Sequence, residues 1–395
     1  MYKKNCNNKE YYGLFNDSFP PIIDGVALAV ENYAKHLNNK GFETCVVTPW
    51  NPVSPELPYE IIRYFSLPIH SRKPYRYGYP KLDPFIWRTL RNTPFRIVHS
   101  HCPFSSGRLG VYVKKKQGVP LIGTFHSKYE SDLKHSFKYT PWMVPIIMGR
   151  ILDFFNACDE VWIPQAQVEE TVREYGYKGK LEVVENGSDF STPPEKELRE
   201  IKIKAKQSKS IGPTQLSLLF VGQHIWEKGL GIICDALPIL KNHGVDFRMN
   251  FVGSGYAQEE LKNKIQDMGL SDSVIINRIV SDRNQLAEFY AAGDLFLFPS
   301  LYDNAPLVLR EAAAFATPGI LPIGSTAAEV ITDDFNGFLS AHSGSAYAEK
   351  ILKLSENREK ILDVGLNASG SIVRSWEDVV EEVIDRYTML IKRKS

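Results

Sequence analysis

Short apolar runs alternate with longer amphipathic segments along most of the chain, a pattern typical of parallel βαβ units. Between the first two runs, apolar residues at helical spacing from Val26 to Lys40, followed by Gly41, predict a helix with a glycine stop. We expect one doubly wound α/β domain over residues 1–195. Its predicted strands are Tyr11–Phe15, Glu43–Val47, Arg96–His99, Pro120–Thr124, Glu160–Ile163 and Leu181–Val184.

The alternation stops between Ser191 and Pro213, where prolines and lysines replace the apolar runs. We expect a linker or an exposed helix at 196–213, and a second doubly wound domain over 214–375. Residues 376–395 have a strongly amphipathic helical pattern, and we expect this helix to return to the first domain. The strands predicted in the second domain are Leu216–Val221, Phe247–Val252, Val274–Ile279, Leu295–Phe298, Gly319–Ile323 and Gly337–Ser340, with helices from Asp235, Ala257, Asn284, Pro306 and Ala346.

Length and composition agree with this organisation. A chain of 395 residues suits two α/β domains, and 43% hydrophobic with 24% charged residues is typical of a soluble protein. The first residues lack the apolar segment of a signal peptide, and no apolar run is long enough to span a bilayer. Five scattered cysteines without a C-x-x-C pair indicate buried thiols in a reducing compartment. We expect a cytoplasmic protein.

Charge is unevenly distributed although the net charge is only +1, which argues against nucleic-acid binding by the whole molecule. Between Leu57 and Lys138, fifteen Lys/Arg face four Asp/Glu, a local excess of +11. Within the stretch 72–138, aromatic residues alternate with basic ones from Arg72 to Lys81. Such a surface is suited to an anionic membrane, so we expect peripheral membrane association, with ordinary solvated loops as the alternative.

Two carboxylates, Asp303 and Glu311, flank a predicted strand-to-helix turn that contains Pro306. The carboxyl edge of an open parallel sheet is where ligands bind, and the free amides of a helix start favour an anion. A carboxylate accepts hydrogen bonds from sugar or ribose hydroxyls. The segment therefore predicts a site that holds a phosphate and hydroxyls side by side, as a nucleotide sugar requires.

A second phosphate-binding arrangement opens the second domain, where a strand is followed by Gly222-Gln-His-Ile-Trp-Glu-Lys-Gly229 and a helix. Lys228 at the start of that helix can neutralise a diphosphate. Taken alone such a turn is common, but it shares its domain with the two carboxylates.

These motifs, in this order, resemble the retaining GT-B glycosyltransferases, in particular glycosyltransferase family 4. The resemblance runs from about residue 11 to 340 and includes loops in both halves of the chain. The segments that carry it are Phe15–Val26, Val98–Phe104, Gly123–Tyr129, Val184–Asp189, Gly222–Gly229, Phe251–Gly255 and Phe298–Ala312. It implies two Rossmann-like domains facing a central cleft, with the acceptor on the first and the nucleotide sugar on the second.

The resemblance also implies a role for each site residue. Gly25 would let the first-domain loop approach the donor diphosphate, and His126 would lie over the donor sugar. Asp303 would bind sugar hydroxyls and Glu311 the ribose. The phosphates would be held by the turn at Gly222, by Gln223 and Lys228, and by the backbone amides of Leu307 and Val308. The reaction would transfer a hexose with retention from a UDP- or GDP-sugar to a lipid or glycan, mostly through leaving-group stabilisation.

The chain departs from the family pattern at three places. Gln223 stands where relatives commonly carry Arg, Asp303 where they carry Glu, and Ala305-Pro306 replaces a glycine-containing turn. The donor base and sugar stay open for this reason. A nucleotide-sugar epimerase of the same fold and an inactive nucleotide-sugar-binding relative are the alternatives.

The sequence predicts neither a cofactor nor a metal. No D-x-D triplet is present, and Lys228 with the helix amides can neutralise the charge of a diphosphate in place of a metal ion. The His99-Ser-His101 spacing has no carboxylate or cysteine cluster near it, which disfavours a metal site. Gly253-Ser-Gly255 lacks the third glycine of a dinucleotide fingerprint, so a dehydrogenase is disfavoured too. We interpret Asp17 and Asp24 as caps of loops, with contact to the acceptor as the alternative.

Overall fold

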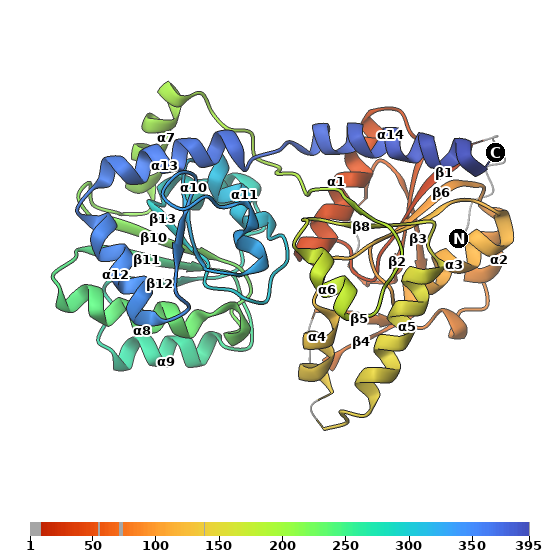
Figure 1. Ribbon diagram of the computed structural model, residues 1–395, viewed down its shortest axis with the longest axis horizontal. Helices are drawn as coiled ribbons and strands as arrows, with labels where there is room; N and C mark the ends of the chain where they lie inside the picture. The colour runs from red at the N-terminus through yellow and green to blue at the C-terminus, as the bar shows by residue number, and fades with distance from the viewer. Residues whose placement is uncertain (1–8, 54–55, 71–73, 138, 395) are drawn as a thin grey trace. The chain divides into compact units, whose positions relative to one another are not determined.

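The computed structural model describes residues 9–53, 56–70, 74–137 and 139–394, and it divides into two compact units. The first unit comprises residues 1–186 together with 376–395, and the second comprises 187–375. Figure 1 colours the chain from red to yellow through most of the first unit and from green to blue through the second, ending in the blue helix of the first unit.

The first unit is built on a parallel sheet of seven strands in the order β3-β2-β1-β6-β7-β8-β9. The chain moves outward from β1 to β3 and then continues on the other side of β1, so the order reverses between β1 and β6. A separate antiparallel pair, β4 with β5, follows β3. The strands are β1 (Tyr11–Phe15), β2 (Thr44–Pro49), β3 (Glu60–Tyr64), β4 (Ser66–Pro68), β5 (Arg76–Gly78), β6 (Phe95–Ser100), β7 (Leu121–Thr124), β8 (Glu160–Ile163) and β9 (Leu181–Val183).

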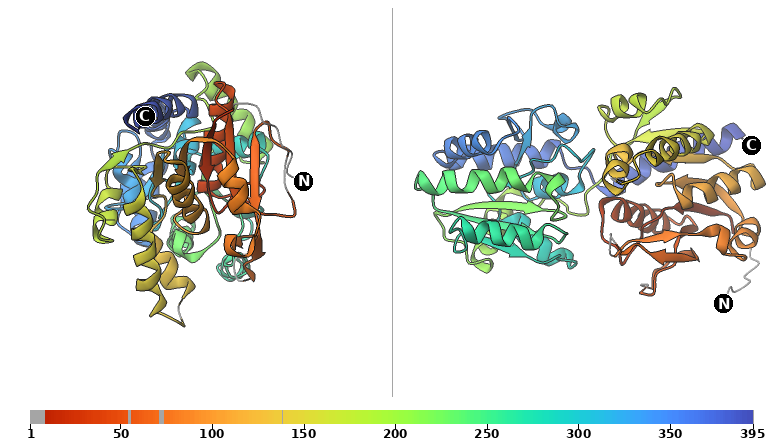
Figure 2. Two further views of the ribbon diagram at one scale, coloured as in Figure 1. Left: turned by 90° about the vertical axis from the view of Figure 1, so that its right-hand side faces the viewer. Right: turned by 90° about the horizontal axis from the view of Figure 1, so that it is seen from below.

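Helices of the first unit follow most of these strands, as a doubly wound fold requires. The last helix, α14, packs against α1, and Figures 1 and 2 show it running alongside this unit. Trp376 at its start is 2% exposed and its ring lies 5.5 Å from that of Tyr33. The predicted return of the C-terminal helix is confirmed. The helices are α1 (Gly25–Asn39), η2 (Pro80–Leu82), α2 (Ile86–Asn92), α3 (Ser105–Gln117), α4 (Tyr129–Ser136), α5 (Met143–Ala157), α6 (Val168–Glu174) and α14 (Trp376–Lys394).

The second unit has a parallel sheet of six strands in the order β12-β11-β10-β13-β14-β15. Here the order reverses between β10 and β13. The strands are β10 (Leu216–Val221), β11 (Phe247–Val252), β12 (Val274–Asn277), β13 (Leu295–Leu297), β14 (Gly319–Pro322) and β15 (Phe338–Ser340). The helices are α7 (Glu195–Ser208), η3 (Trp226–Lys228), α8 (Leu230–Asn242), α9 (Gln258–Asp267), α10 (Arg283–Ala292), α11 (Leu307–Ala314), η4 (Thr326–Val330), α12 (Gly344–Ser355) and α13 (Arg358–Ser371).

Both faces of this second sheet are covered by helices (Figure 1). One hydrophobic core joins the sheet to α8, α9 and α12 through residues such as Leu237, Leu261 and Tyr347. The other joins it to α10 and α11 through Tyr290 and Leu309. The fold class is therefore the predicted one, with two doubly wound α/β units.

The domain boundary differs from the prediction. The units divide between Asn186 and Gly187. The segment 196–213, predicted as a linker or an exposed helix, carries most of the helix α7 within the second unit. This helix belongs there because Leu198 and Ala205 are buried, and because the Lys202 ammonium donates to the carbonyl of Gly293 at 2.8 Å. Few apolar residues are needed for such a helix to dock, which is why its composition resembles a linker.

Other segments also differ in detail. β3 joins the first sheet although no strand was predicted there, α8 begins at Leu230 and not at Asp235, and α13 was not predicted. Among the described residues, no helix combines the length and apolar character needed to cross a membrane. Of the cysteines, Cys45 and Cys234 are fully buried, Cys102 and Cys158 are partly exposed, all four are free thiols, and Cys6 lies outside the described residues.

Candidate functional site

The carboxyl ends of β10 and β13 form the candidate site of the second unit. These strands are neighbours in the sheet, with Leu218 opposite Leu295. Because the strand order reverses between them, their following loops diverge and leave the crevice in which doubly wound folds bind ligands. The sequence-predicted donor residues of this unit lie in these two loops and in α11.

The loop after β10 is held against the loop after β13 by a glycine. Gly222 leads out of the strand, Gln223 is exposed, and η3 then brings the chain to Gly229 at φ +76°. A Cβ on Gly229 would lie 2.6 Å from the carbonyl oxygen of Pro299. Only glycine fits both this backbone conformation and this close approach.

Lys228 and Asp303 form an ion pair across the two loops. The hydroxyl of Ser300 donates to the second carboxylate oxygen of Asp303 at 2.6 Å, and the Lys228 ammonium lies 5.4 Å from the ring centre of Tyr302. The two charged side chains are only 14% and 16% exposed. The site therefore presents a cation suited to phosphate next to an acceptor suited to hydroxyls.

The start of α11 lies directly after this pair. Pro306 is the N-cap residue and supplies no side-chain cap, and the first turn contains no acidic residue. The amides of Leu307 and Val308 are among the first N–H groups of the helix, which have no carbonyl partner within it. The helix dipole adds a partial positive charge there, so an anion is favoured beside Lys228 and Asp303.

Glu311 is buried in the second turn of α11, with 5% of its side chain exposed. One oxygen pairs with the Arg283 guanidinium at 2.7 Å, and the other accepts the hydroxyl of Tyr290 at 2.6 Å. Arg283 also pairs with Asp189 at 3.1 Å and stacks over Phe190. Sequence reasoning missed these partners.

The contacts in this cluster shift the pKa values of Arg283 and Tyr290. Burial opposes the charged form of Arg283, but the charge and hydrogen bond of Glu311, with Asp189, raise its pKa overall. Burial, reinforced by the Glu311 charge, raises the pKa of Tyr290 well above its usual range. Tyr290 is therefore a neutral donor, and the two partners hold the Glu311 carboxylate in one orientation.

The first unit carries the other two predicted residues, His126 and Gly25. His126 follows β7, and its Nε2 lies 3.0 Å from Nδ1 of His101, which follows β6. Burial lowers the pKa of His126 to about 4, so the ring is neutral at pH 7. For His101, burial and then the neighbouring histidines His99 and His126 lower the pKa well below 6.5.

Gly25 begins α1 at the end of the loop after β1. A Cβ there would meet nothing within 4 Å, so packing inside the first unit gives no reason for a glycine. Asp24 caps α1 by accepting from the amides of Val26 and Ala27, and Asp17 accepts from the amide of Ser105 at the start of α3. The interpretation of both aspartates as caps is confirmed.

No group of three or more His, Cys, Asp or Glu side chains within the described ranges is arranged to hold a metal ion. His99, inside β6, instead contacts the Tyr387 hydroxyl and the Thr124 hydroxyl, each at 2.6 Å. Its ring is therefore held by the core of the first unit and by α14.

Comparison with known proteins identifies the fold and the family. The profile of Glycosyltransferase Family 4 matches residues 23–192, and that of Glycosyl transferases group 1 matches 201–369. Anabaena HepE, solved in complex with UDP and glucose, superposes with a TM-score of 0.75 at 17% identity, over 96% of this chain and all of that one.

Two curated relatives have informative names. The alpha-monoglucosyldiacylglycerol synthase of Streptococcus pneumoniae is 24% identical over 83% of this chain and 74% of its own length. The D-inositol 3-phosphate glycosyltransferase of Xylanimonas cellulosilytica is 26% identical over 76% of this chain and 73% of its own.

Proposed function

Because the chain is a GT-B glycosyltransferase of family 4, we propose that it transfers a hexose, with retention, from a UDP- or GDP-sugar to a lipid or glycan acceptor. The observation that carries this proposal is the Lys228–Asp303 pair beside the uncapped start of α11. That arrangement offers a cation, backbone donors and a hydroxyl acceptor within one crevice, which matches the parts of a sugar diphosphate.

In this proposal catalysis stabilises the leaving group. Lys228 and the amides of Leu307 and Val308 take up the charge that develops on the departing diphosphate, so no metal is required. Asp303 orients the donor sugar through its hydroxyls, and Glu311, held by Arg283 and Tyr290, accepts the ribose hydroxyls. Such fixed groups need little reorganisation when the bond breaks.

The other donor contacts are assigned by the resemblance. Gly222 and Gln223 would lie against the phosphates, and Gly25 of the first unit would let its loop approach them. His126 would face the donor sugar. A neutral imidazole there can accept or donate one hydrogen bond without adding charge.

We test the donor site by measuring transfer from radiolabelled UDP-glucose and GDP-glucose to a membrane lipid extract. Lys228→Gln should lower kcat about 100-fold or more, because it removes the cation beside the leaving group. Lys262→Gln, which removes an exposed lysine of the same unit, is the control. Equal rates for Lys228→Gln and the wild type would refute the proposed site.

The same assay separates the alternatives. An epimerase converts the nucleotide sugar without an acceptor, and an inactive relative binds it without forming product. Labelled product that depends on added lipid, with release of the nucleoside diphosphate, supports the transferase. Product stereochemistry, determined by NMR, tests retention.

A lipid acceptor requires the enzyme to reach a membrane surface, and the named synthase of a glycosylated diacylglycerol supports that requirement. Within the basic stretch, Lys81 and Arg88 are exposed beside Leu82 and Phe85, each 64% exposed. Other basic residues of this stretch form ion pairs within the first unit. Lys114 pairs with Asp159 and Lys134 with Glu130, while Arg72, Lys73 and Lys138 lie outside the described residues.

We therefore assign membrane contact to the surface formed by Lys81, Leu82, Phe85 and Arg88. Phe85→Ser should reduce sedimentation with vesicles that contain phosphatidylglycerol, because it removes an apolar anchor. Ile203→Ser, which changes an exposed apolar residue of the second unit, should leave it unchanged. Sedimentation that is insensitive to both salt and Phe85→Ser would contradict this assignment.

A further inference from the structure

Three histidine rings lie side by side at β6 and β7, and only one of them has a role in the reaction proposed above. His99 lies in β6, His101 directly follows this strand, and His126 follows β7, which pairs with β6 in the sheet. The ring centre of His101 lies 4.0 Å from that of His99 and 5.3 Å from that of His126. His101 is 1% exposed. It therefore connects a histidine of the core to the histidine that would face the donor sugar.

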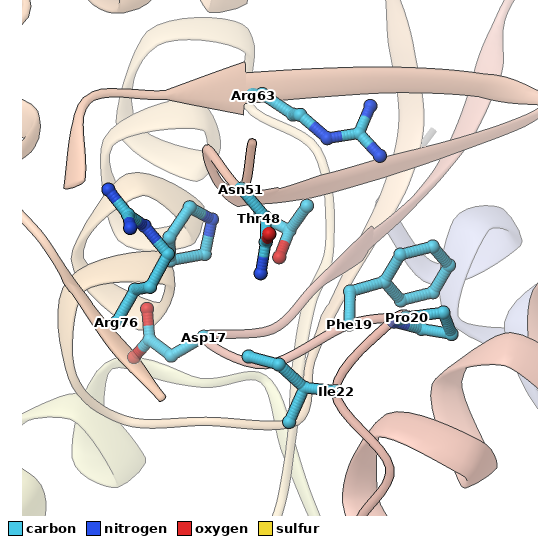
Figure 3. Close-up of a pocket in the computed structure, with 9 residues that line it drawn as sticks. Asp17, Phe19, Pro20, Ile22, Thr48, Asn51, Arg63 and Arg76 are labelled. Carbon is cyan, nitrogen blue, oxygen red and sulfur yellow. The ribbon is translucent and has the colours of Figure 1, made fainter. Parts of the chain in front are cut away.

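The backbone of His101 is fixed by its surroundings. Its amide donates to the carbonyl of Phe15, the last residue of β1, at 2.9 Å. Asp17, which also lines the small pocket drawn in Figure 3, accepts the amides of Ser105 at 3.0 Å and Ser106 at 2.9 Å, where α3 begins. The short segment between β6 and α3 is thus held at both ends, which limits the orientations open to the imidazole ring.

One ring nitrogen of His101 contacts His126, and the other has no partner. Nδ1 of His101 lies 3.0 Å from Nε2 of His126, at hydrogen-bond distance. Nε2 of His101 is buried and has no hydrogen-bond partner in the part of the chain that the structure describes. His99 does not supply one, because its own nitrogens contact the hydroxyls of Tyr387 and Thr124.

These contacts determine which nitrogen carries each proton. Burial lowers the pKa of both His101 and His126, so each ring is neutral at pH 7 and has one N–H group. If His126 were the donor, the proton of His101 would lie on Nε2, as a buried N–H without an acceptor. If His101 is the donor, its Nε2 has only a lone pair, and buried acceptors without a partner are less rare than such N–H groups. The second arrangement is favoured, and it places the proton of His126 on Nδ1.

We propose that His101 is a positioning residue that donates from its Nδ1 to Nε2 of His126 and thereby fixes the tautomer of His126 with the proton on Nδ1. This inference deepens the proposed function, and it rests on that function only for the assignment of His126 to the donor sugar. A sugar hydroxyl bound by His126 then accepts from Nδ1–H. Because the lone pair of His126 is bound to His101, His126 does not act as a base, which agrees with catalysis by stabilisation of the leaving group.

Two variants of His101 separate the hydrogen bond from the packing of the ring. Asparagine carries an amide nitrogen close to the position of Nδ1 and can donate to His126, whereas leucine has the same branching without a donor. Both His101→Asn and His101→Leu remove the ring, so the loss of its packing is common to the two variants. A difference between them reports on the donated hydrogen bond.

Heteronuclear NMR spectra of the full chain, isotopically labelled at its histidines, report which imidazole nitrogen carries the proton. The signals of His126 are identified by their loss in His126→Gln. The proton of His126 should lie on Nδ1 in the wild type and in His101→Asn, whereas His101→Leu should shift the tautomer ratio about fivefold or more toward Nε2, the effect of one hydrogen bond. His243→Asn, which changes an exposed histidine of the second unit, should leave these signals unchanged.

A wild-type proton on Nε2 of His126 would overturn the proposal, and this spectrum decides the point even if His101→Leu does not fold. The same tautomer ratio in His101→Asn and His101→Leu would overturn it too, because the ratio would then not depend on the donor.

Sugar transfer gives a separate readout. His101→Leu should lower kcat/KM about fivefold or more relative to His101→Asn, because a sugar hydroxyl then meets the wrong tautomer of His126. A changed tautomer with equal kcat/KM in the two variants would refute a role of this pair in transfer. If the wild type transfers no sugar, the proposed function fails, and the spectra still test the pairing of His101 with His126.

Discussion

At Glu311 the chemistry of one carboxylate depends on two side chains from a different helix. Arg283 and Tyr290 of α10 occupy one oxygen each, so the carboxylate is buried and fixed in orientation. Such a carboxylate can exchange one partner for a ribose hydroxyl without being desolvated again. Its contribution to binding should therefore be larger than that of an exposed acid.

The first prediction concerns this residue. Glu311→Gln should weaken UDP binding by about tenfold or more, measured by calorimetry, because it replaces a charged acceptor of ribose hydroxyls. A UDP analogue without ribose hydroxyls should bind the wild type and this variant equally. Glu288→Gln, which removes an exposed acid from α10, is the matched control. Unchanged UDP affinity in Glu311→Gln would exclude the ribose role.

The second prediction follows from the neutral His126. Its pKa is about 4 in the folded unit against 6.5 when exposed, so the unfolded chain binds more protons between these values. The neutral, buried ring of His126 makes its full contribution to stability above pH 6.5. As the pH falls to 4, this contribution is lost, and the free energy of unfolding decreases by about 3 kcal/mol at most. Urea unfolding from pH 7 to 4 should show a shallower decline for His126→Gln. His70→Gln, at an exposed histidine, should follow the wild type.

Candidate site residues that belong to sequence motifs could be predicted from the sequence. The residues that contact them in the fold could not. Lys228 and Asp303 stand in loops next to apolar runs, and the structure brings them into contact. Arg283 lies 28 positions before Glu311, and nothing in its neighbourhood marks it as a partner. Only the docking of α10 beside α11 creates that contact.

At the scale of elements, the crevice depends on two loops that must touch. Gly229 is the cap residue between η3 and α8, and its positive φ and its close approach to Pro299 both exclude a side chain. The loop bearing Lys228 thereby reaches the loop bearing Asp303. A change in this glycine should disturb the site even though glycine has no chemistry of its own.

We predict that Gly229→Ala lowers stability by about 2 kcal/mol or more, from the strained backbone and the overlap with Pro299. It should also weaken UDP binding. Gly231→Ala, two residues further into α8, meets nothing within 4 Å and should be neutral or stabilising by up to about 1 kcal/mol. Chemical denaturation and calorimetry measure the two effects. Equal stability of these variants would contradict the steric argument.

Strands that are buried on both faces of the sheet could be predicted, because their sequences are continuous runs of apolar residues. Leu216–Val221 and Phe247–Val252 were predicted with their observed bounds. β3 is an edge strand with Glu60 and Arg63 among its five residues, so its pattern is weak although it pairs along β2. The helix α7 also has few apolar residues, because only a narrow stripe of its surface packs against α10.

At the scale of the whole molecule, the chain returns to its first unit after completing the second. α14 supplies Trp376 and Tyr387 to the first unit, where Tyr387 contacts His99 at 2.6 Å and stacks on Trp162. The first unit therefore cannot be completed until the last residues are present. Its stability should depend on a helix that is adjacent in sequence to the second unit.

This arrangement leads to the last prediction. Trp376→Ala should destabilise the first unit by about 3 to 5 kcal/mol, because a fully buried indole is removed from its contact with α1. Hydrogen exchange should accelerate in α1 and in the strands β1 and β6, and it should stay unchanged in β10 and β11. Met389→Ala, at a half-exposed position of the same helix, controls for changes in α14 itself. If exchange accelerated equally in both sheets, α14 would be a shared support and not part of the first unit.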